Sequence, residues 1–222
     1  MNLSELNILF LDNHLVVVEK PRGMLTQPTN ENQEALEGKV KAFLKQKLNK
    51  PQGVFLHVVH RLDQVVSGIV LFAKTSKALE RLNQASREKQ FVKVYIAEVE
   101  KVISEDRKTL VHYLKHDEFK ATITNRNDKE GKEAILSYQV IERKKDSTIV
   151  KIRLETGRYH QIRAQFKAFG HPIKGDFKYG AKKINDEGIY LHHAYLEFDH
   201  PVTKEKIKIV SQPDFYPSKI SF

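Results

Sequence analysis

The sequence HRLD, residues 60–63, ends an apolar stretch and stands shortly before Ser67-Gly68. Reactive side chains are commonly presented where a strand opens into a loop. Arg61 and Asp63 are two residues apart, so they share a face if the strand continues through them. A nearby cation keeps a carboxylate ionised, and an ionised carboxylate can act as a nucleophile or a general base. The same spacing also fits a structural Arg–Asp pair that closes the turn, and spacing alone does not decide between the two.

A second candidate lies in the alternating sequence FVKVYIAEVE, residues 91–100, which predicts a strand. Lys93 and Tyr95 share one face of it, while Val92 and its apolar neighbours pack on the other. A tyrosine there can stack on a nucleic-acid base, and a lysine can meet a phosphate. An ordinary half-exposed strand would show the same pair of residues.

The third candidate is ETGRYHQIR, residues 155–163, which opens a helix predicted over 158–169 and closed by Gly170. At helical spacing His160, Arg163 and Lys167 form one polar stripe beside the helix N-terminus, a position that favours anions. We expect no metal there, because the nearest histidine, at position 171, lies across a glycine and no carboxylate follows at helical spacing. His192 and His193 point to opposite faces of a strand and make a poor chelating pair.

Composition narrows the chemistry. The 222 residues contain no cysteine, so thiolate nucleophiles, disulfides and cysteine zinc sites are excluded. The formal charge of +10 favours a polyanion as partner, although lysine-rich solvated faces would give the same count. The sequence has no P-loop lysine motif, dinucleotide glycine fingerprint or GxSxG elbow, which argues against NTPase, dehydrogenase and serine-hydrolase functions.

The elements that must position these residues follow from periodicity and turn signals. Residues 8–21 predict a hairpin that turns at Asp12-Asn13, and Thr75 or Ser76 caps a helix over 76–89. A further helix is predicted over 33–48, and further strands over 54–63, 69–74, 135–143, 148–156, 189–198 and 206–211. Strands and helices interleave irregularly with tight hairpins. We therefore expect a single α+β domain over 1–222, on a largely antiparallel or mixed sheet flanked by helices.

Taken together, these segments resemble the RluA family of RNA pseudouridine synthases. EKPRGMLTQP after the hairpin is similar to the family's opening segment, HRLD with Ser67-Gly68 to its central signature, and Lys93-x-Tyr95 to its tyrosine motif. ETGRYHQIR running into GHPIKGDFKYG resembles the third block, and LHHAYLEFDHP resembles the last. Each piece is short, but the five occur in the family's order and cover nearly the whole chain.

The resemblance implies an enzyme that isomerises uridine in rRNA or tRNA to pseudouridine without metal or organic cofactor. Asp63 matches the family's essential aspartate, Tyr95 the tyrosine that packs against the target base, and Arg163 the arginine that pairs with the aspartate. Arg61 matches the arginine that fills the gap left by the flipped-out uridine, and Leu191 an apolar residue of the pocket. A base inside a stack must be extruded before such chemistry, at a cost of a few kcal/mol.

The remaining basic residues of these motifs, Lys93, Arg158 and His160, are expected to bind RNA and set its register. Two positions depart from the family pattern, since Val66 replaces a usual threonine and His193 a usual alanine. His193 could narrow the rim of the pocket or donate to a phosphate. We expect these two departures to affect RNA specificity rather than catalytic activity.

Two other functions remain open at this point. A non-catalytic RNA-binding protein on the same fold would use Asp63 to close a turn. A nucleoside or nucleotide glycosidase would pair Asp63 with Glu155 and release free uracil.

The sequence also indicates where and how the protein works. No apolar run reaches the length of a membrane span, and the first residues do not have the pattern of a signal peptide. The hairpin begins within ten residues of the start, which leaves no room for an S4-type RNA-binding domain. We expect a cytoplasmic monomer that recognises an RNA stem-loop through its catalytic domain alone.

Overall fold

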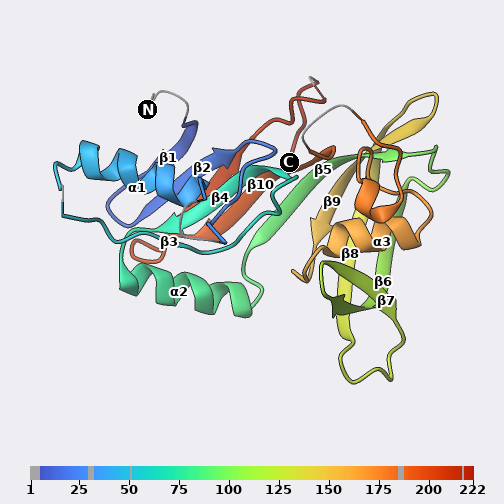
Figure 1. Ribbon diagram of the computed structural model, residues 1–222, viewed down its shortest axis with the longest axis horizontal. Helices are drawn as coiled ribbons and strands as arrows, with labels where there is room; N and C mark the ends of the chain where they lie inside the picture. Colours follow the sequence, from blue (N-terminus) through green and yellow to red (C-terminus); the bar gives the residue numbers. More distant parts are fainter. Residues whose placement is uncertain (1–5, 30–32, 51, 185–187, 217) are drawn as a thin grey trace. The chain divides into compact units, whose positions relative to one another are not determined.

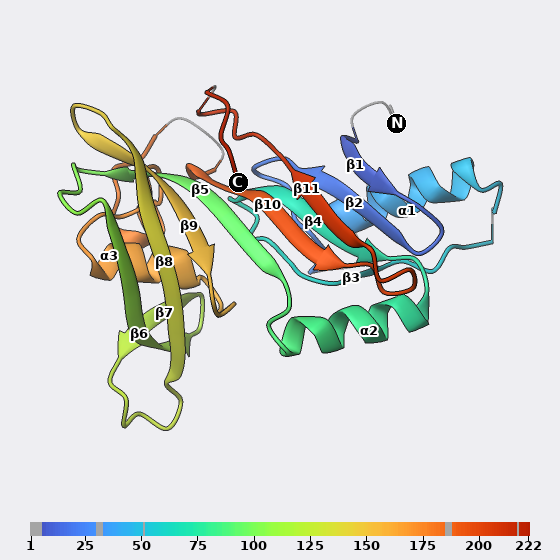
Figure 2. The same ribbon diagram turned by 180° about the vertical axis from the view of Figure 1, so that it is seen from behind.

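The computed structural model describes residues 6–29, 33–50, 52–184, 188–216 and 218–222. Figures 1 and 2 show its ribbon from opposite sides. The chain divides into two compact units: unit 1 comprises Met1–Val92 with His193–Phe222, and unit 2 comprises Lys93–His192. Strands and helices interleave along the chain, which confirms the predicted α+β class. Within the described residues, no helix is long and apolar enough to cross a membrane.

Unit 1 is a sheet with two helices. Its strands are β1 (Ile8–Leu11), β2 (Leu15–Lys20), β3 (His57–Val58), β4 (Ser67–Ala73), β10 (Leu191–Asp199, from His193 onwards) and β11 (Lys206–Val210); its helices are α1 (Leu36–Lys47) and α2 (Ser76–Arg87). The strand order is β1-β2-β4-β10, with β11 paired to β10 and β3 to β4. Figure 2 shows β11 beside β10. Both faces of β2 and β4 are buried, as their β-branched sequences require.

One apolar core of unit 1 lies between α2 and this sheet. Leu82 and Ala78 of the helix pack against apolar side chains of the strands, among them Val17, Leu71 and Phe198. Thr75 caps α2, because its hydroxyl accepts a hydrogen bond from the N–H of Ala78 at 3.2 Å. This cap agrees with the sequence and satisfies one of the donors that every helix start leaves open.

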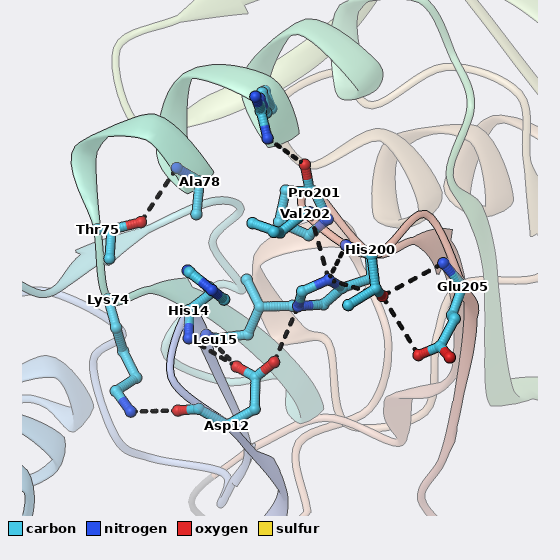
Figure 3. Close-up of polar contacts among 12 residues, drawn as sticks. Asp12, His14, Leu15, Lys74, Thr75, Ala78, His200, Pro201, Val202 and Glu205 are labelled. Atoms are coloured by element: carbon cyan, nitrogen blue, oxygen red, sulfur yellow. Dashed lines mark hydrogen bonds and ion pairs between the residues drawn. The ribbon is translucent and has the colours of Figure 1, made fainter.

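The β1–β2 turn is fastened to the β10–β11 turn by a buried polar network (Figure 3). The Asp12 carboxylate accepts hydrogen bonds from the N–H groups of His14 and Leu15 at 2.8 and 2.7 Å. Its other oxygen lies 2.8 Å from Nε2 of His200, which is almost fully buried. Because Nδ1 of His200 accepts from the N–H of Thr203 at 2.9 Å, the ring proton sits on Nε2 and is donated to Asp12.

Unit 2 is a second sheet with one α-helix. Its elements are β5 (Val92–Glu100, from Lys93 onwards), β6 (Arg107–Asp117), β7 (Lys120–Thr124), β8 (Lys132–Arg143), β9 (Ser147–Leu154), α3 (Gln161–Ala168) and the short 3₁₀ helix η2 (Phe177–Tyr179). The strand order is β5-β9-β8-β6-β7, antiparallel throughout this series. Ala164 of α3 packs with Leu114, Ala121 and Tyr179 in a small core on one face of this sheet. Figure 1 shows α3 beside these strands.

Two local predictions need correction. The strand expected over 54–63 shrinks to His57–Val58, so Arg61 and Asp63 lie in a loop and their facing is not set by a strand. β3 pairs with β4 only at Phe72 and Ala73, because β10 occupies the same edge of β4 near Gly68 and Ile69. The helix expected over 158–169 starts at Gln161, because the residue before it has a left-handed backbone with φ of 50°.

Candidate active site

Asp63 stands in a tight turn that unit 1 holds from both sides. Its carbonyl accepts a hydrogen bond from the N–H of Val66 at 3.1 Å, which closes the turn. On one side, the Thr26 hydroxyl donates to the Leu62 carbonyl at 2.8 Å and accepts from the Leu62 N–H at 3.2 Å. On the other, the Gln64 carbonyl accepts from the N–H of Gly23 at 3.0 Å. The segment EKPRGMLT is therefore a clamp for the turn that carries Asp63.

Lys20 lies at the centre of this clamp. Its side chain is fully buried, and its ammonium donates to the carbonyls of Pro21, Met24 and Gln64 at 3.0, 2.7 and 3.1 Å. Burial lowers the pKa of Lys20 to about 7, although the negative charge of Asp63 opposes the shift. Lys20 therefore lies within electrostatic reach of Asp63, and its ammonium fixes the carbonyl of the next residue, Gln64.

Two departures from the family pattern pack beneath the same turn. Val66 is buried, so an apolar side chain suits its position. His193 is fully buried, its Nδ1–H donates to the Ile69 carbonyl at 2.8 Å, and its ring meets that of His60 edge-on at 5.2 Å. The expectation that His193 could narrow a pocket rim or donate to a phosphate is therefore wrong, because the residue is internal to unit 1.

Arg163 lies in unit 2 and is held by a second carboxylate. Its Nε and Nη2 donate to the two oxygens of Asp176 at 2.7 and 2.9 Å, and both side chains are buried. The guanidinium also lies over the ring of Tyr179, 4.9 Å from its centroid. These contacts fix Arg163 in one orientation, and the Asp176 carboxylate partly compensates its charge.

Tyr95, Lys93 and Leu191 also belong to unit 2. Tyr95 is buried on β5, where it pairs in register with Ile152, and Leu191 is buried at the start of β10. Burial lowers the pKa of Lys93. The alternative of an ordinary half-exposed strand does not hold, because β5 is buried on both faces from Val94 to Val99.

Arg158 and His160 differ in exposure. Arg158 is exposed and its Nε donates to the Glu133 carbonyl at 2.9 Å. His160 is buried, with Nδ1 at 3.0 Å from the hydroxyl of Tyr179. Arg163 is buried as well, so the polar stripe predicted for α3 is not a surface stripe and only Lys167 of it is exposed.

The predicted site residues thus fall in two groups, with Asp63 and Arg61 in unit 1 and the others in unit 2. Sequence reasoning missed Lys20, Asp176 and Tyr179 as functional residues. Lys20 ends an apolar strand, but lysine is rarely buried, so no local signal identifies it. Asp176 and Tyr179 stand in GDFKYG, whose acidic and aromatic residues could have been paired with the basic helix before it.

Comparison with known proteins gives the family. The sequence pattern described as RNA pseudouridylate synthase matches residues 14–168, more than half of the chain and including Asp63, Tyr95 and Arg163. The chain belongs to the RNA pseudouridylate synthase family. An uncharacterised RNA pseudouridine synthase of Bacillus subtilis, YlyB, is 36% identical over 92% of this chain and 68% of its own length. The ribosomal large subunit pseudouridine synthase C of Vibrio cholerae is 31% identical over 91% and 64%.

Solved structures agree in fold. The human RNA pseudouridylate synthase domain containing 1 superposes with a TM-score of 0.80 at 22% identity, covering 98% of this chain and 87% of that one. The human RNA pseudouridylate synthase domain containing 4 superposes with a TM-score of 0.78 at 23% identity, covering 94% of this chain and 89% of that one. The resemblance inferred from the five sequence blocks is confirmed, and with it the enzyme class: this RNA pseudouridylate synthase isomerises uridine in RNA to pseudouridine.

Proposed function

We propose that Asp63 is the catalytic residue of this pseudouridine synthase and that ribosomal RNA is its substrate. The observation that carries the first part is the clamp in unit 1, which fixes the carbonyls on both sides of Asp63 and buries Lys20 beside it. A turn held this closely serves to place one side chain, and precise placement is what catalysis requires.

The reaction breaks the N1–C1′ bond of uridine, turns the base and joins C5 to C1′. N1 gains a proton and C5 loses one, so mass is conserved and no base is released. Asp63 can take part by attacking C1′ or C6, or by removing the proton on C2′, and each route needs an ionised carboxylate. Lys20 lies in the same clamp, where the negative charge of Asp63 opposes the lowering of the Lys20 pKa by burial.

The residues of unit 2 complete the site. Tyr95 stacks on the flipped-out base, which offsets ~1–3 kcal/mol of the extrusion cost. Arg163 pairs with Asp63 while Asp176 and Tyr179 hold it in place. Leu191 lines the pocket for the base. A single catalytic domain over 1–222, as expected from the sequence, remains part of this proposal.

RNA contacts outside the pocket complete the assignment. Arg61 fills the gap that the uridine leaves, and Lys93 and Arg158 bind phosphates around it. His160 contributes by supporting its exposed neighbour Tyr159, on which its ring stacks. The net charge of +10 suits a polyanion. Similarity to the ribosomal large subunit pseudouridine synthase C of Vibrio cholerae supports ribosomal RNA as the substrate. The protein acts as a monomer in the cytoplasm, where it meets its RNA.

The test uses purified protein and a ribosomal RNA transcript carrying tritium at C5 of uridine. Forming pseudouridine releases that tritium to water, so the wild-type protein releases it and the Asp63→Asn variant does not. The variant should bind the transcript as the wild type does. Asp199→Asn makes the same change at an exposed aspartate of unit 1 and should release tritium normally.

Each other outcome points elsewhere. Loss of RNA affinity in Asp63→Asn together with activity indicates that Asp63 only shapes an RNA-binding surface. Free uracil among the products indicates a glycosidase. Full activity in Asp63→Asn removes Asp63 from the mechanism.

A further inference from the structure

Unit 2 carries three exposed aromatic side chains that the proposed catalytic site does not use. Phe119 in the β6–β7 turn is 72% exposed, Phe177 of η2 is 73% exposed, and Tyr159 before α3 is 45% exposed. We call these three residues the aromatic patch. Single exposed apolar residues are common on protein surfaces, so the case rests on whether the three are gathered and fixed.

Printed contacts join the three segments. The hydroxyl of Tyr159 lies 3.5 Å from the carbonyl of Phe119, at the limit of hydrogen bonding. The ammonium of Lys178, the residue after Phe177, donates to the same carbonyl at 3.2 Å. Tyr159 also meets the ring of His116 edge-on at 4.6 Å. The β6–β7 turn, the start of α3 and η2 therefore form one continuous surface.

One member of the patch, Tyr159, is held in place by buried groups. The ring of Tyr159 stacks on His160 with centroids 3.9 Å apart and planes 18° apart. His160 in turn contacts the hydroxyl of Tyr179 at 3.0 Å, and that hydroxyl accepts from the N–H of Ala121 at 2.7 Å. The left-handed backbone at His160, with φ of 50°, is the local distortion that places the two rings one above the other.

The same support reaches Arg163. Tyr179, which anchors His160, carries the guanidinium of Arg163 over its ring. Only the Tyr179–His160 pair thus separates the exposed Tyr159 from the arginine proposed to act at the target uridine.

Charge favours a nucleic acid over an apolar partner, though moderately. Lys178 and Arg158 border the patch, while Asp117, Glu118 and Lys120 of the turn sum to a charge of −1. Phosphate attraction alone is therefore weak here. Stacking on aromatic rings is the stronger term, and because every base has a π-face it tolerates any sequence.

We propose that the aromatic patch binds unpaired nucleotides of the RNA substrate by stacking, next to the nucleotide that Arg163 helps to hold. The position relative to the target uridine rests on the proposed function, whereas the stacking itself does not. Unpaired bases are the form in which RNA is recognised by aromatic side chains, since bases inside a duplex are not accessible to them.

The test measures binding of two probes, an end-labelled single-stranded oligoadenylate and an RNA duplex of the same length. The double variant Phe119→Ala/Phe177→Ala should bind the oligoadenylate roughly 5- to 150-fold more weakly and the duplex unchanged. With the tritiated transcript, KM should rise by a similar factor while kcat stays at the wild-type value. Val111→Ala is the control, because Val111 of β6 is an exposed apolar residue of the same unit, 53% exposed, that does not belong to the aromatic patch.

The double variant Phe119→Tyr/Phe177→Tyr keeps both rings and should bind the oligoadenylate as the wild type does. If the alanine variant unfolds, as far-UV circular dichroism would show, the comparison is made with Phe119→Leu, which keeps apolar bulk without a ring and should also bind weakly.

Equal binding of oligoadenylate by wild type and ring-deleted variants overturns the proposal. So does weakening of both probes alike, or a variant that binds RNA normally but loses self-association or a protein partner. Failure of the proposed catalytic function has a different signature, because wild-type protein would then release no tritium while the patch variants still lost oligoadenylate affinity.

Discussion

Replacing Lys20 by methionine should change how stability depends on pH. Methionine has a similar length and no charge, so Lys20→Met removes the buried ammonium and its three hydrogen bonds to carbonyls. The unfolded chain holds the Lys20 proton up to its ordinary pKa of 10.5, whereas the folded protein releases it above about 7. Between these two values the unfolded chain binds more protons, so the wild-type protein gains stability as pH rises.

The magnitude follows from the size of the shift. One pKa unit corresponds to 1.36 kcal/mol, so a shift from 10.5 to about 7 is on the order of 5 kcal/mol between the charged and neutral forms. This cost of keeping the ammonium charged is fully present below about pH 7 and disappears towards pH 10.5. Lys20→Met has no such group and lacks this dependence.

The assay is urea unfolding of both proteins across this pH range, followed by far-UV circular dichroism because the chain has no tryptophan. The stability of the wild type minus that of Lys20→Met should rise by roughly 2–3 kcal/mol between about pH 7.5 and about pH 9.5. In the Asp63→Asn background the rise should begin at lower pH, since the charge that opposes the shift is gone. A difference that stays constant across the range would refute the assignment of Lys20 as a buried, titrating amine.

Two further substitutions test the packing around the site. Asp176→Asn should lower the free energy of unfolding by about 3–5 kcal/mol, because it removes the Asp176 carboxylate from the buried ion pair with Arg163. The same change at the exposed Asp106 should cost less than about 1 kcal/mol. Calorimetry of the two variants checks this, and equal losses would contradict it. Gly68→Ala should cost at least about 2 kcal/mol, since its Cβ would lie 2.4 Å from a backbone oxygen of β10 and φ is +115°. Gly38→Ala places its new methyl group in open space on α1 and should stabilise the protein by roughly 0.5–1 kcal/mol. Thermal unfolding should therefore show a lower melting temperature for Gly68→Ala and a higher one for Gly38→Ala. A Gly68→Ala protein as stable as the wild type would contradict the clash.

Much of the fold was predictable because the signals were local. The hairpin turn at Asp12 and the cap at Thr75 each depend on a side chain bonding to backbone two or three residues away, and both are present. Such contacts join residues that are close in sequence, so a short stretch of sequence is enough to predict them. The strands predicted over 135–143 and 148–156 are also present, as β8 and β9.

Predictions failed where long-range contacts decide. The β6–β7 pair was missed because its strands carry many charged and histidine residues, and their partners are set by pairing with β8 and packing against α3. The stretch 54–63 has the composition of a strand, but β10 takes most of the edge of β4 that it would need. A single sequence does not reveal which segment wins an edge.

The site was predictable in part. Asp63, Tyr95 and Arg163 came from the resemblance, and the family match covers all three, while their roles remain proposals. The groups that hold them did not come from the sequence: Lys20 acts through carbonyls up to forty-four positions away, and Asp176 reaches Arg163 across thirteen. Such supporting contacts depend on the folded backbone, and a motif contains no record of them.

The central claim is that Asp63 catalyses pseudouridine formation at defined positions in cellular RNA. The most direct measurement maps pseudouridine in total RNA from cells without this protein, from cells given the wild type back, and from cells given Asp63→Ala. We predict that one or a few sites, in ribosomal RNA, disappear without the protein and return only with the wild type. Sites that return with Asp63→Ala as well, or a map that is the same in all three, would contradict the account.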